Sequence, residues 1–271
     1  MSSAIDYASW KKEYRSILEA FSGKKVLMLF SGGKDSSLAM DLILRAGKEF
    51  DFYFDVHTGA FPVHRYPNKE RERIGSYWNK RGVNIIWHEV AETDEHIKNA
   101  GDPCFSCQKL RKGILKPILA EAGYDIGSIV LIAGFSLWDI VGYSVEYILA
   151  DVFSDSKRKA GAAKNQRFVE TGQRFYPLLK MREGYTVFRP LIRYNGCDIQ
   201  KSIEEASIPT LSEPCKFKEF RPKRVFETYY QNAGIRFDYD KVLDFARRSL
   251  GLSDISTYIS IDKDEYLLKV F

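Results

Sequence analysis

Seven consecutive residues, 31–37, combine glycines with hydroxyl side chains in an order that suits phosphate binding. The apolar run at 25–30 before them predicts a buried strand, and the apolar pattern at 37–44 predicts a helix. Glycines let backbone N–H groups approach an anion closely, and the N-terminus of a helix attracts negative charge. The spacing is not that of a Walker P-loop. We therefore expect a phosphate site at Ser31, Gly32, Gly33, Lys34, Asp35, Ser36 and Ser37.

One residue of this stretch, Asp35, carries a charge that repels phosphate. We expect Asp35 to order the loop or to help hold Mg²⁺ with its waters. Asp139, at the start of a predicted helix over 138–151, is a second candidate for the metal or for organising the loop. Capping of that helix is the alternative role for Asp139.

Three of the four cysteines form a pattern that suits a metal centre. Cys104 and Cys107 make a C-x-x-C before a predicted helix, and Cys215 follows from a distant loop. Structural zinc takes four protein ligands, so three thiolates suit it poorly, whereas they can hold three corners of a [4Fe–4S] cluster. A redox pair at Cys104 and Cys107, or zinc completed by another residue, stays open. We expect Cys197 to be a packing residue.

The phosphate stretch resembles the SGGxDS loop of the PP-loop ATP-pyrophosphatase (adenine nucleotide alpha-hydrolase-like) superfamily. The segment Cys104–Leu115 is similar to the CxxC-xx-LRRGIL segment of the tRNA 2-thiocytidine synthetase family, and Phe188-Arg189-Pro190-Leu191 and Pro214-Cys215 follow that family's order. Two features depart from the family pattern. Lys218 stands where that family has a further cysteine, and Phe135 and Trp138 stand where it has a histidine and an aspartate.

The resemblance implies an ATP-dependent, AMP- and pyrophosphate-forming sulfurtransferase. Such an enzyme adenylates a carbonyl oxygen of a tRNA base, or of a related nucleobase or small molecule, and replaces that oxygen with sulfur. The resemblance further implies ATP, Mg²⁺ and a [4Fe–4S] cluster as cofactors. It assigns the cluster to Cys104, Cys107 and Cys215, which with Asp35 are the expected catalytic residues.

Two other functions remain open from the sequence. The first is a non-thiolating adenylating ligase or amidotransferase-type enzyme of the same superfamily, with a zinc or redox cysteine site. The second is a sulfonucleotide reductase-like protein. That reductase would need a catalytic cysteine in a mobile tail, and no cysteine follows Cys215.

Strand and helix patterns alternate along the chain, which predicts an α/β fold. The expected strands span residues 25–30, 50–57, 84–88, 128–134 and 187–191. The expected helices include 7–22, 67–80, 138–151 and 197–206, with two more between 222 and 250 and strand-like cover at 255–259. This order predicts a doubly wound, mostly parallel five-stranded sheet with a helical C-terminal extension. We expect an N-terminal helix at 1–22, a PP-loop ATP-pyrophosphatase domain carrying the cysteine site at 23–215, and the extension at 216–271.

Ligands of such sheets bind beyond the carboxyl ends of the strands. His57, Thr58 and Gly134 follow two of the predicted strands, so we expect them, with Asp139, beside the nucleotide. The other histidines show no ligand spacing, and we expect them to be structural or exposed.

The composition is that of an ordinary globular protein, with 45% apolar and 28% charged residues. No apolar run has the length of a membrane span and the first residues are polar, so we expect a cytoplasmic protein that binds no membrane. The net charge of +5 permits RNA. A sulfur donor is expected as a partner, and a homodimer is one hypothesis. A basic, aromatic stretch suits phosphate contacts with RNA or a nucleotide, or else forms a solvated loop: Lys216, Phe217, Lys218, Phe220, Arg221, Lys223 and Arg224.

Overall fold

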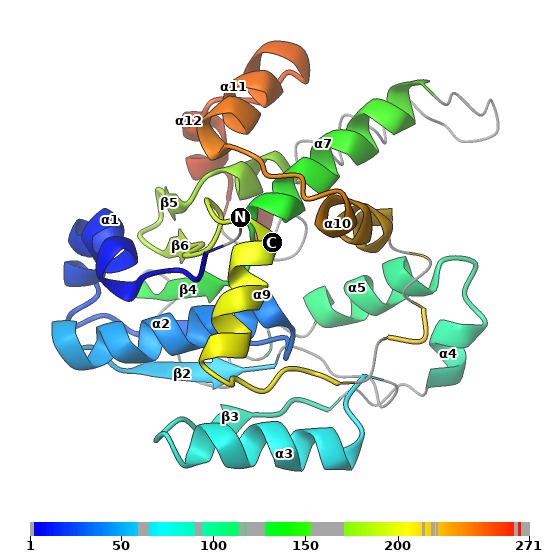
Figure 1. The fold of residues 1–271 in the computed structure, drawn as a ribbon. Coiled ribbons are helices and arrows are strands. Elements are labelled where there is room, and N and C mark those ends of the chain that lie inside the picture. Colours follow the sequence, from blue (N-terminus) through cyan, green and yellow to red (C-terminus); the bar gives the residue numbers. More distant parts are fainter. Residues whose placement is uncertain are drawn as a thin grey trace.

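A computed structural model describes most of the chain around one central sheet (Figure 1). The described residues are 3–58, 65–89, 94–113, 117, 128–152, 171–212, 215–217, 220, 222–262 and 265–266. The strands are β1 (Val26–Leu29), β2 (Phe54–His57), β3 (Ile85–Ile86), β4 (Val130–Ala133), β5 (Leu178–Lys180) and β6 (Thr186–Phe188). Their order is β3-β2-β1-β4-β6-β5, and only β5, paired with β6, runs antiparallel.

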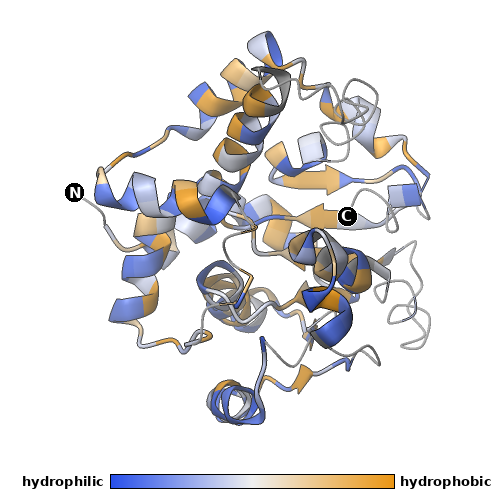
Figure 2. Cartoon of the chain, turned by 90° about the vertical axis from the view of Figure 1, so that its right-hand side faces the viewer, coloured by the Kyte–Doolittle hydropathy of each residue, from blue (hydrophilic) through white to orange (hydrophobic). Residues whose placement is uncertain are grey.

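Helices cover both faces of this sheet. Strand β1 shows why, because its alternate side chains enter two different cores: Val26 and Met28 enter one, and Leu27 enters the other. The first core is closed by α1 (Tyr7–Glu19), α2 (Lys34–Phe50), α3 (Asn68–Asn79) and α9 (Gly196–Glu205). The second is closed by α7 (Leu137–Val152), α10 (Pro222–Asn232), α11 (Tyr239–Ser249) and α12 (Ile255–Ile259). Figure 2 shows that the strands are mostly hydrophobic and that the helices carry both hydrophobic and hydrophilic residues.

The doubly wound, mostly parallel α/β fold with a helical C-terminal part is confirmed. Within the described residues the sheet has six strands rather than five, because β5 finds its hydrogen bonds by pairing with β6. The strand expected at 255–259 is wrong. Asp254 accepts a hydrogen bond from the Ser256 amide at 2.9 Å and so begins helix α12, which overrides the β-branched pattern.

Two further sequence predictions concern the division into domains and one basic segment. The division into parts 1–22, 23–215 and 216–271 stays a prediction. Residues 155–174 are basic in part and lack apolar periodicity, which predicts a solvated loop or a segment that grips the substrate; apart from the last four positions, they lie outside the described residues.

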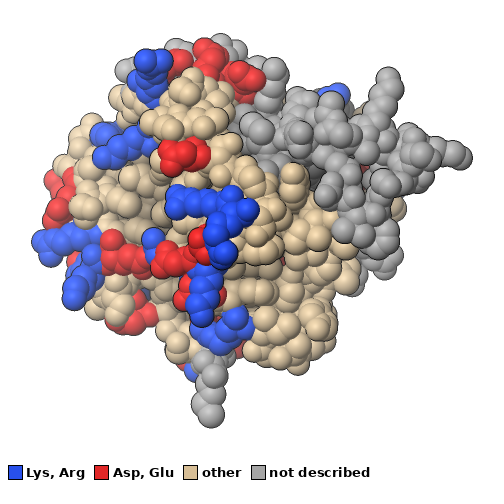
Figure 3. Space-filling view, turned by 90° about the horizontal axis from the view of Figure 1, so that it is seen from above, with Lys and Arg blue, Asp and Glu red and all other residues tan. Residues whose placement is uncertain are grey.

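No helix among the described residues has both the length and the apolar character needed to cross a membrane. Figure 3 shows the molecule from above, where acidic and basic side chains are interleaved on the part of this face that carries charge.

The strand ends and the start of α2 meet in close backbone contact. A Cβ atom added at Gly134, just after β4, would lie 2.7 Å from the Ser36 Cα atom and 2.8 Å from the Ser36 nitrogen. No side chain fits at such distances, so Gly134 lets β4 approach the first turn of α2. The cysteine helix α5 (Pro103–Gly113) and the short α4 (Asp94–Lys98) complete this side of the molecule (Figure 1).

We expect Gly134→Ala to destabilise the protein by about 1–3 kcal/mol, because the new methyl group overpacks against backbone atoms. Gly75→Ala is the matched control, since Gly75 lies within α3 and its added Cβ would meet nothing within 4 Å. That control should be neutral or stabilising, by up to about 1 kcal/mol. Denaturant unfolding of both variants measures the difference, and equal stability of the two would contradict the packing argument.

Candidate active site

Residues 31–37, which are expected to bind phosphate and which we call the phosphate loop, connect β1 to the first turn of α2, as their sequence context predicts. Gly32 has a positive φ of 67°, which favours glycine, and Gly33 is the N-cap of α2 without any side-chain capping bond. The first N–H groups of a helix have no partners within the helix. With the positive end of the dipole of this 17-residue helix, they form an arrangement that can bind an anion.

The serine hydroxyls of the loop form a local network. The Ser31 and Ser36 Oγ atoms lie 3.0 Å apart, and Ser36 Oγ also donates to the Gly33 carbonyl at 3.1 Å. Ser37 is fully buried, and its Oγ has no hydrogen-bond partner among the described residues. Hydrogen bonds within the loop therefore hold its conformation, and its hydroxyl groups can rotate toward a ligand.

The residues expected beside the nucleotide lie level with one another. Leu29 of β1 pairs in register with His57 of β2 and with Ala133 of β4, which precedes Gly134. The Thr58 hydroxyl accepts from the His88 amide at 3.1 Å and donates to the Ile86 carbonyl at 3.3 Å. The carboxyl ends of β1, β2 and β4 thus meet at one edge of the sheet.

His57 and His88 form a pair that the sequence did not reveal. Nδ1 of His57 lies 2.8 Å from Nε2 of His88, and the two rings are nearly parallel. Burial, helped by His88, lowers the pKa of His57 to about 4. His57 is therefore neutral at neutral pH and joins the ends of β2 and β3.

A cluster of charged side chains lies beside the phosphate loop, and we call it the carboxylate–lysine cluster. Lys34 Nζ lies 3.0 Å from Asp35 Oδ1. Lys223 of α10 forms an ion pair with Asp139 of α7 and lies 3.4 Å from Glu227. Removing one partner of a buried ion pair costs about 3–5 kcal/mol, because the other charge stays buried.

Charge and burial oppose each other within this cluster. Burial raises the pKa of Asp35, and the Lys34 ammonium only partly offsets the increase. Burial also acts to raise the pKa of Asp139, but Lys223, the Ser136 amide and Lys34 together outweigh burial, and the pKa is lowered. For Lys223, the carboxylates outweigh burial and raise the pKa. Asp139 and Lys223 are therefore charged at neutral pH.

Asp139 has two roles that use different oxygens. Oδ2 accepts from the Ser136 amide at 2.8 Å and from the Ser136 hydroxyl at 3.0 Å, which caps the start of α7. Oδ1 faces Lys223. The capping alternative is therefore realised, and it leaves one oxygen directed into the charged cluster.

The cysteine segments lie next to each other. Cys104 and Cys107 lie on α5, and Cys104 Sγ donates to the Phe217 carbonyl at 3.3 Å, two residues after Cys215. All three cysteine side chains are half-buried. Within the described ranges, no three histidine, cysteine or acidic side chains converge at metal-binding spacing. The structure thus brings the two cysteine segments together without gathering their three thiols around one point.

The segment that leads to Cys215 is attached to the phosphate loop. The Leu211 amide donates to the Gly32 carbonyl at 2.8 Å, and the Ser212 amide donates to Glu70 of α3 at 2.8 Å. Cys215 follows Leu211 by four positions, so their Cα atoms lie at most about 14 Å apart. The predicted phosphate site and the cysteine segments therefore lie in the same part of the molecule.

Tyr66 lies close to both the phosphate loop and the cysteine helix α5. A Cβ atom added at Gly32 would lie 3.0 Å from the Tyr66 ring and hydroxyl. Burial raises the pKa of Tyr66, and the charges of Arg111 and Cys107 on α5 also act on it. Tyr66 therefore packs under the phosphate loop within electrostatic reach of the cysteine helix.

Sequence reasoning missed Tyr66, His88, Leu211 and Glu227, and it assigned Lys223 to a basic stretch that contacts the phosphates of RNA or of a nucleotide. The four-residue spacing of Lys223 and Glu227 is a sequence signal for a pair on one helix face. No local signal tells which neighbour that face meets. Lys218 and Arg221 of the same basic stretch lie outside the described residues.

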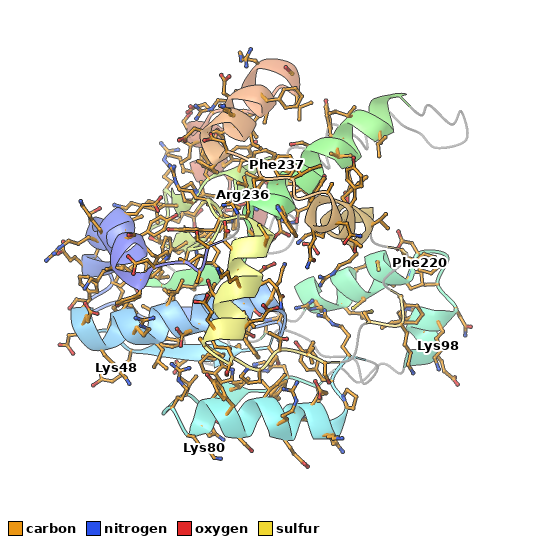
Figure 4. The ribbon with its side chains drawn as sticks, in the orientation of Figure 1. Lys48, Lys80, Lys98, Phe220, Arg236 and Phe237 are labelled. Atoms are coloured by element: carbon orange, nitrogen blue, oxygen red, sulfur yellow. The ribbon has the colours of Figure 1, made fainter. Side chains whose placement is uncertain are left out.

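Cys197 lies apart from these features. It packs against the second core, and its Sγ accepts from Arg236 at 3.5 Å. Arg236 also makes two 2.7 Å bonds to Asp198 near the start of α9 (Figure 4). These contacts agree with the packing role expected for Cys197.

Comparison with known proteins gives consistent relatives. No family model matches the chain. A tRNA-cytidine(32) 2-sulfurtransferase of Dichelobacter nodosus is 27% identical over 192 residues, covering 70% of this chain and 64% of that protein. One of Paraburkholderia phymatum is 26% identical over 207 residues, covering 70% and 56%. The chain thus spans less than two thirds of the length of these curated relatives.

A solved structure shares the fold. It is the U34-tRNA thiolase NcsA from Methanococcus maripaludis with its [4Fe-4S] cluster, with a TM-score of 0.61 and 17% identity over 94% of this chain and 84% of that one. With the Gly32–Gly33 loop between β1 and α2, the chain is thus similar in sequence to tRNA-cytidine(32) 2-sulfurtransferases and shares its fold with a tRNA thiolase.

Proposed function

We propose that this chain is an ATP-dependent sulfurtransferase that adenylates a carbonyl oxygen of a tRNA base and replaces it with sulfur. The observation that carries the proposal is the attachment of the Cys215 segment to the phosphate loop through Leu211 and Gly32. A second contact joins that segment to Cys104. An adenylating site and a thiol site must adjoin if an activated carbon is to receive sulfur. The tRNA sulfurtransferases among the relatives support the same reaction.

In this proposal the phosphate loop holds the polyphosphate chain of ATP. The amides of Gly32 and Gly33 and the neighbouring hydroxyls bind it, Lys34 adds charge, and His57, Thr58 and Gly134 face the adenosine. The carbonyl oxygen attacks the α-phosphorus, and the bond from that phosphorus to pyrophosphate breaks. Sulfur then bonds to the carbon, and AMP leaves with the former carbonyl oxygen and the electron pair of the broken bond.

The residues present fit Mg²⁺. This ion is bound by one or two carboxylates together with substrate phosphates. Asp139, which is buried, and Asp35, whose side chain is 15% exposed, supply two carboxylates beside the phosphate loop, and they are the proposed ligands. A bound Mg²⁺ would offset the negative charge of the departing pyrophosphate.

The cysteines fit an iron–sulfur cluster in donor type. Cys104 and Cys107 lie one helical turn apart, and the Phe217 carbonyl brings the Cys215 segment against Cys104. Thiolates are the ligands of such clusters. We propose that the three cysteines hold a [4Fe–4S] cluster, which would supply the sulfur to the activated carbon. A separate sulfur donor, a homodimer and a cytoplasmic location complete the proposal.

The substrate is tested by mass spectrometry of tRNA nucleosides from cells that lack the gene. We expect one thiolated base to disappear and to return with the wild-type gene but not with Cys215→Ser. Cys197→Ser should restore it, since that thiol lies outside the proposed site. An unchanged set of thiolated nucleosides would contradict a tRNA substrate.

The cluster is tested by anaerobic purification. We expect a brown protein with about four irons per chain. Cys104→Ser, Cys107→Ser and Cys215→Ser should each lower the iron content, and Cys197→Ser should leave it unchanged. A colourless wild-type protein that contains zinc would be the contrary result.

The ATP half is tested by comparing two glycines that both have a positive φ. Gly32→Ala adds backbone strain and presses on Leu211 and Tyr66, at a cost of the order of 2 kcal/mol. Pyrophosphate release from ATP should fall roughly 30-fold if that cost acts on the transition state. Gly23→Ala carries the same kind of strain with nothing within 4 Å, so its release rate should match the wild type. Similar losses in both variants would argue against the loop's role.

A further inference from the structure

Lys223 is a member of the carboxylate–lysine cluster for which, as for Glu227, the proposed reaction has not yet given a role. It belongs to α10, in the C-terminal part of the chain, far in sequence from the phosphate loop. Its side chain is only 16% exposed, and it pairs with Asp139 and approaches Glu227. A long, strongly hydrated side chain is rarely buried to this extent on a helix that could turn it toward solvent.

Lys223 lies beside the lysine of the loop itself. The Nζ atoms of Lys34 and Lys223 approach the same oxygen, Oε1 of Glu227, at 3.9 and 3.4 Å. The two ammonium groups are therefore neighbours, one from the loop and one from α10. Two cations set side by side at a helix N-terminus match the charge of two adjacent phosphate groups.

Helix packing directs Lys223 to this place. A Cβ atom added at Gly142 of α7 would lie 3.4 Å from Cγ and 3.7 Å from Cβ of Lys223, so the lysine stem crosses α7 where α7 has no side chain. Asp139 is fixed in turn, because Ser136 holds its other carboxylate oxygen. The ammonium is thus positioned by two rigid helices rather than by a loop.

We propose that Lys223 binds the β- and γ-phosphates of ATP and the pyrophosphate product, so that α10 completes the phosphate site. The inference rests on the proposed cleavage of ATP between its α- and β-phosphates. Lys223 and Lys34 together stabilise the charge that develops on the departing pyrophosphate. Asp139 and Glu227 keep the Lys223 ammonium aligned beside the loop.

The test uses a charge-matched double variant, Lys223→Met with Glu227→Gln. It removes one cation and one anion, so the net charge of the cluster is unchanged, and Asp139 keeps its two hydrogen bonds from Ser136. Calorimetric titration with Mg²⁺-pyrophosphate and, separately, with AMP measures each ligand directly. We expect the dissociation constant for pyrophosphate to rise at least tenfold and that for AMP to stay unchanged. With the wild-type cysteines retained, kcat for pyrophosphate release should fall roughly 100-fold.

Two further variants test whether the effect is specific to the charge at position 223. Lys241→Met, on the exposed surface of α11, should match the wild type in every measurement. Lys223→Arg keeps the charge and should recover part of the pyrophosphate affinity. Thermal unfolding of each variant shows whether it is folded.

The outcomes separate this inference from the proposed function. If the double variant binds AMP and pyrophosphate equally more weakly, or if its pyrophosphate binding is unchanged, only the proposed role of Lys223 is overturned. A wild-type protein that binds no Mg²⁺-pyrophosphate overturns both this role and the ATP half of the proposed function. A selective loss of pyrophosphate binding, partly restored by Lys223→Arg, supports the inference.

Discussion

The parallel pairing of β1 with β2 on one side and β4 on the other is the constraint on which the site depends. Because Leu29 is in register with both His57 and Ala133, three strands end at the same level. Their carboxyl ends then deliver the phosphate loop, Thr58 and Gly134 to one edge of the sheet. The close approach of Gly134 to the first turn of α2 sets the depth at which the loop lies. A slip by one residue would exchange the side chains of β1 between the two cores.

The charged cluster beside the loop is stable because its members satisfy one another. Each buried ion loses hydration at a cost of several kcal/mol, which only nearby opposite charges and hydrogen bonds can offset. Here Lys223 reaches Asp139 and Glu227, and Ser136 holds the remaining oxygen of Asp139. A cluster arranged in this way keeps its charges fixed before any ligand arrives. Fixed charges stabilise a developing charge better than water does, because little reorganisation accompanies the reaction.

The adjacency of the phosphate loop and the cysteines arises from backbone contacts rather than from sequence proximity. The Leu211–Gly32 bond and the Glu70–Ser212 bond hold the chain just before Cys215, and the Cys104–Phe217 contact holds it just after. Eight residues after Cys215 the same chain returns to the phosphate loop through Lys223. One stretch of the C-terminal half therefore touches both the proposed adenylation site and the proposed sulfur site, as a reaction with two successive steps on one carbon requires.

The sequence by itself determined the local elements. The apolar runs and the glycines predicted the strand, the phosphate loop and helix α2, because turn and helix signals lie within a few neighbouring residues. The cysteine spacing indicated a thiol centre in the same way. Strand β5 and helix α12 were missed, since pairing with β6 and the Asp254 cap outweigh local propensity. Only the tertiary structure decided that Lys223 turns inward, that His57 meets His88, and that Leu211 binds Gly32. These contacts join residues far apart in the chain, and the packing of rigid helices and strands, rather than any local pattern, selects them.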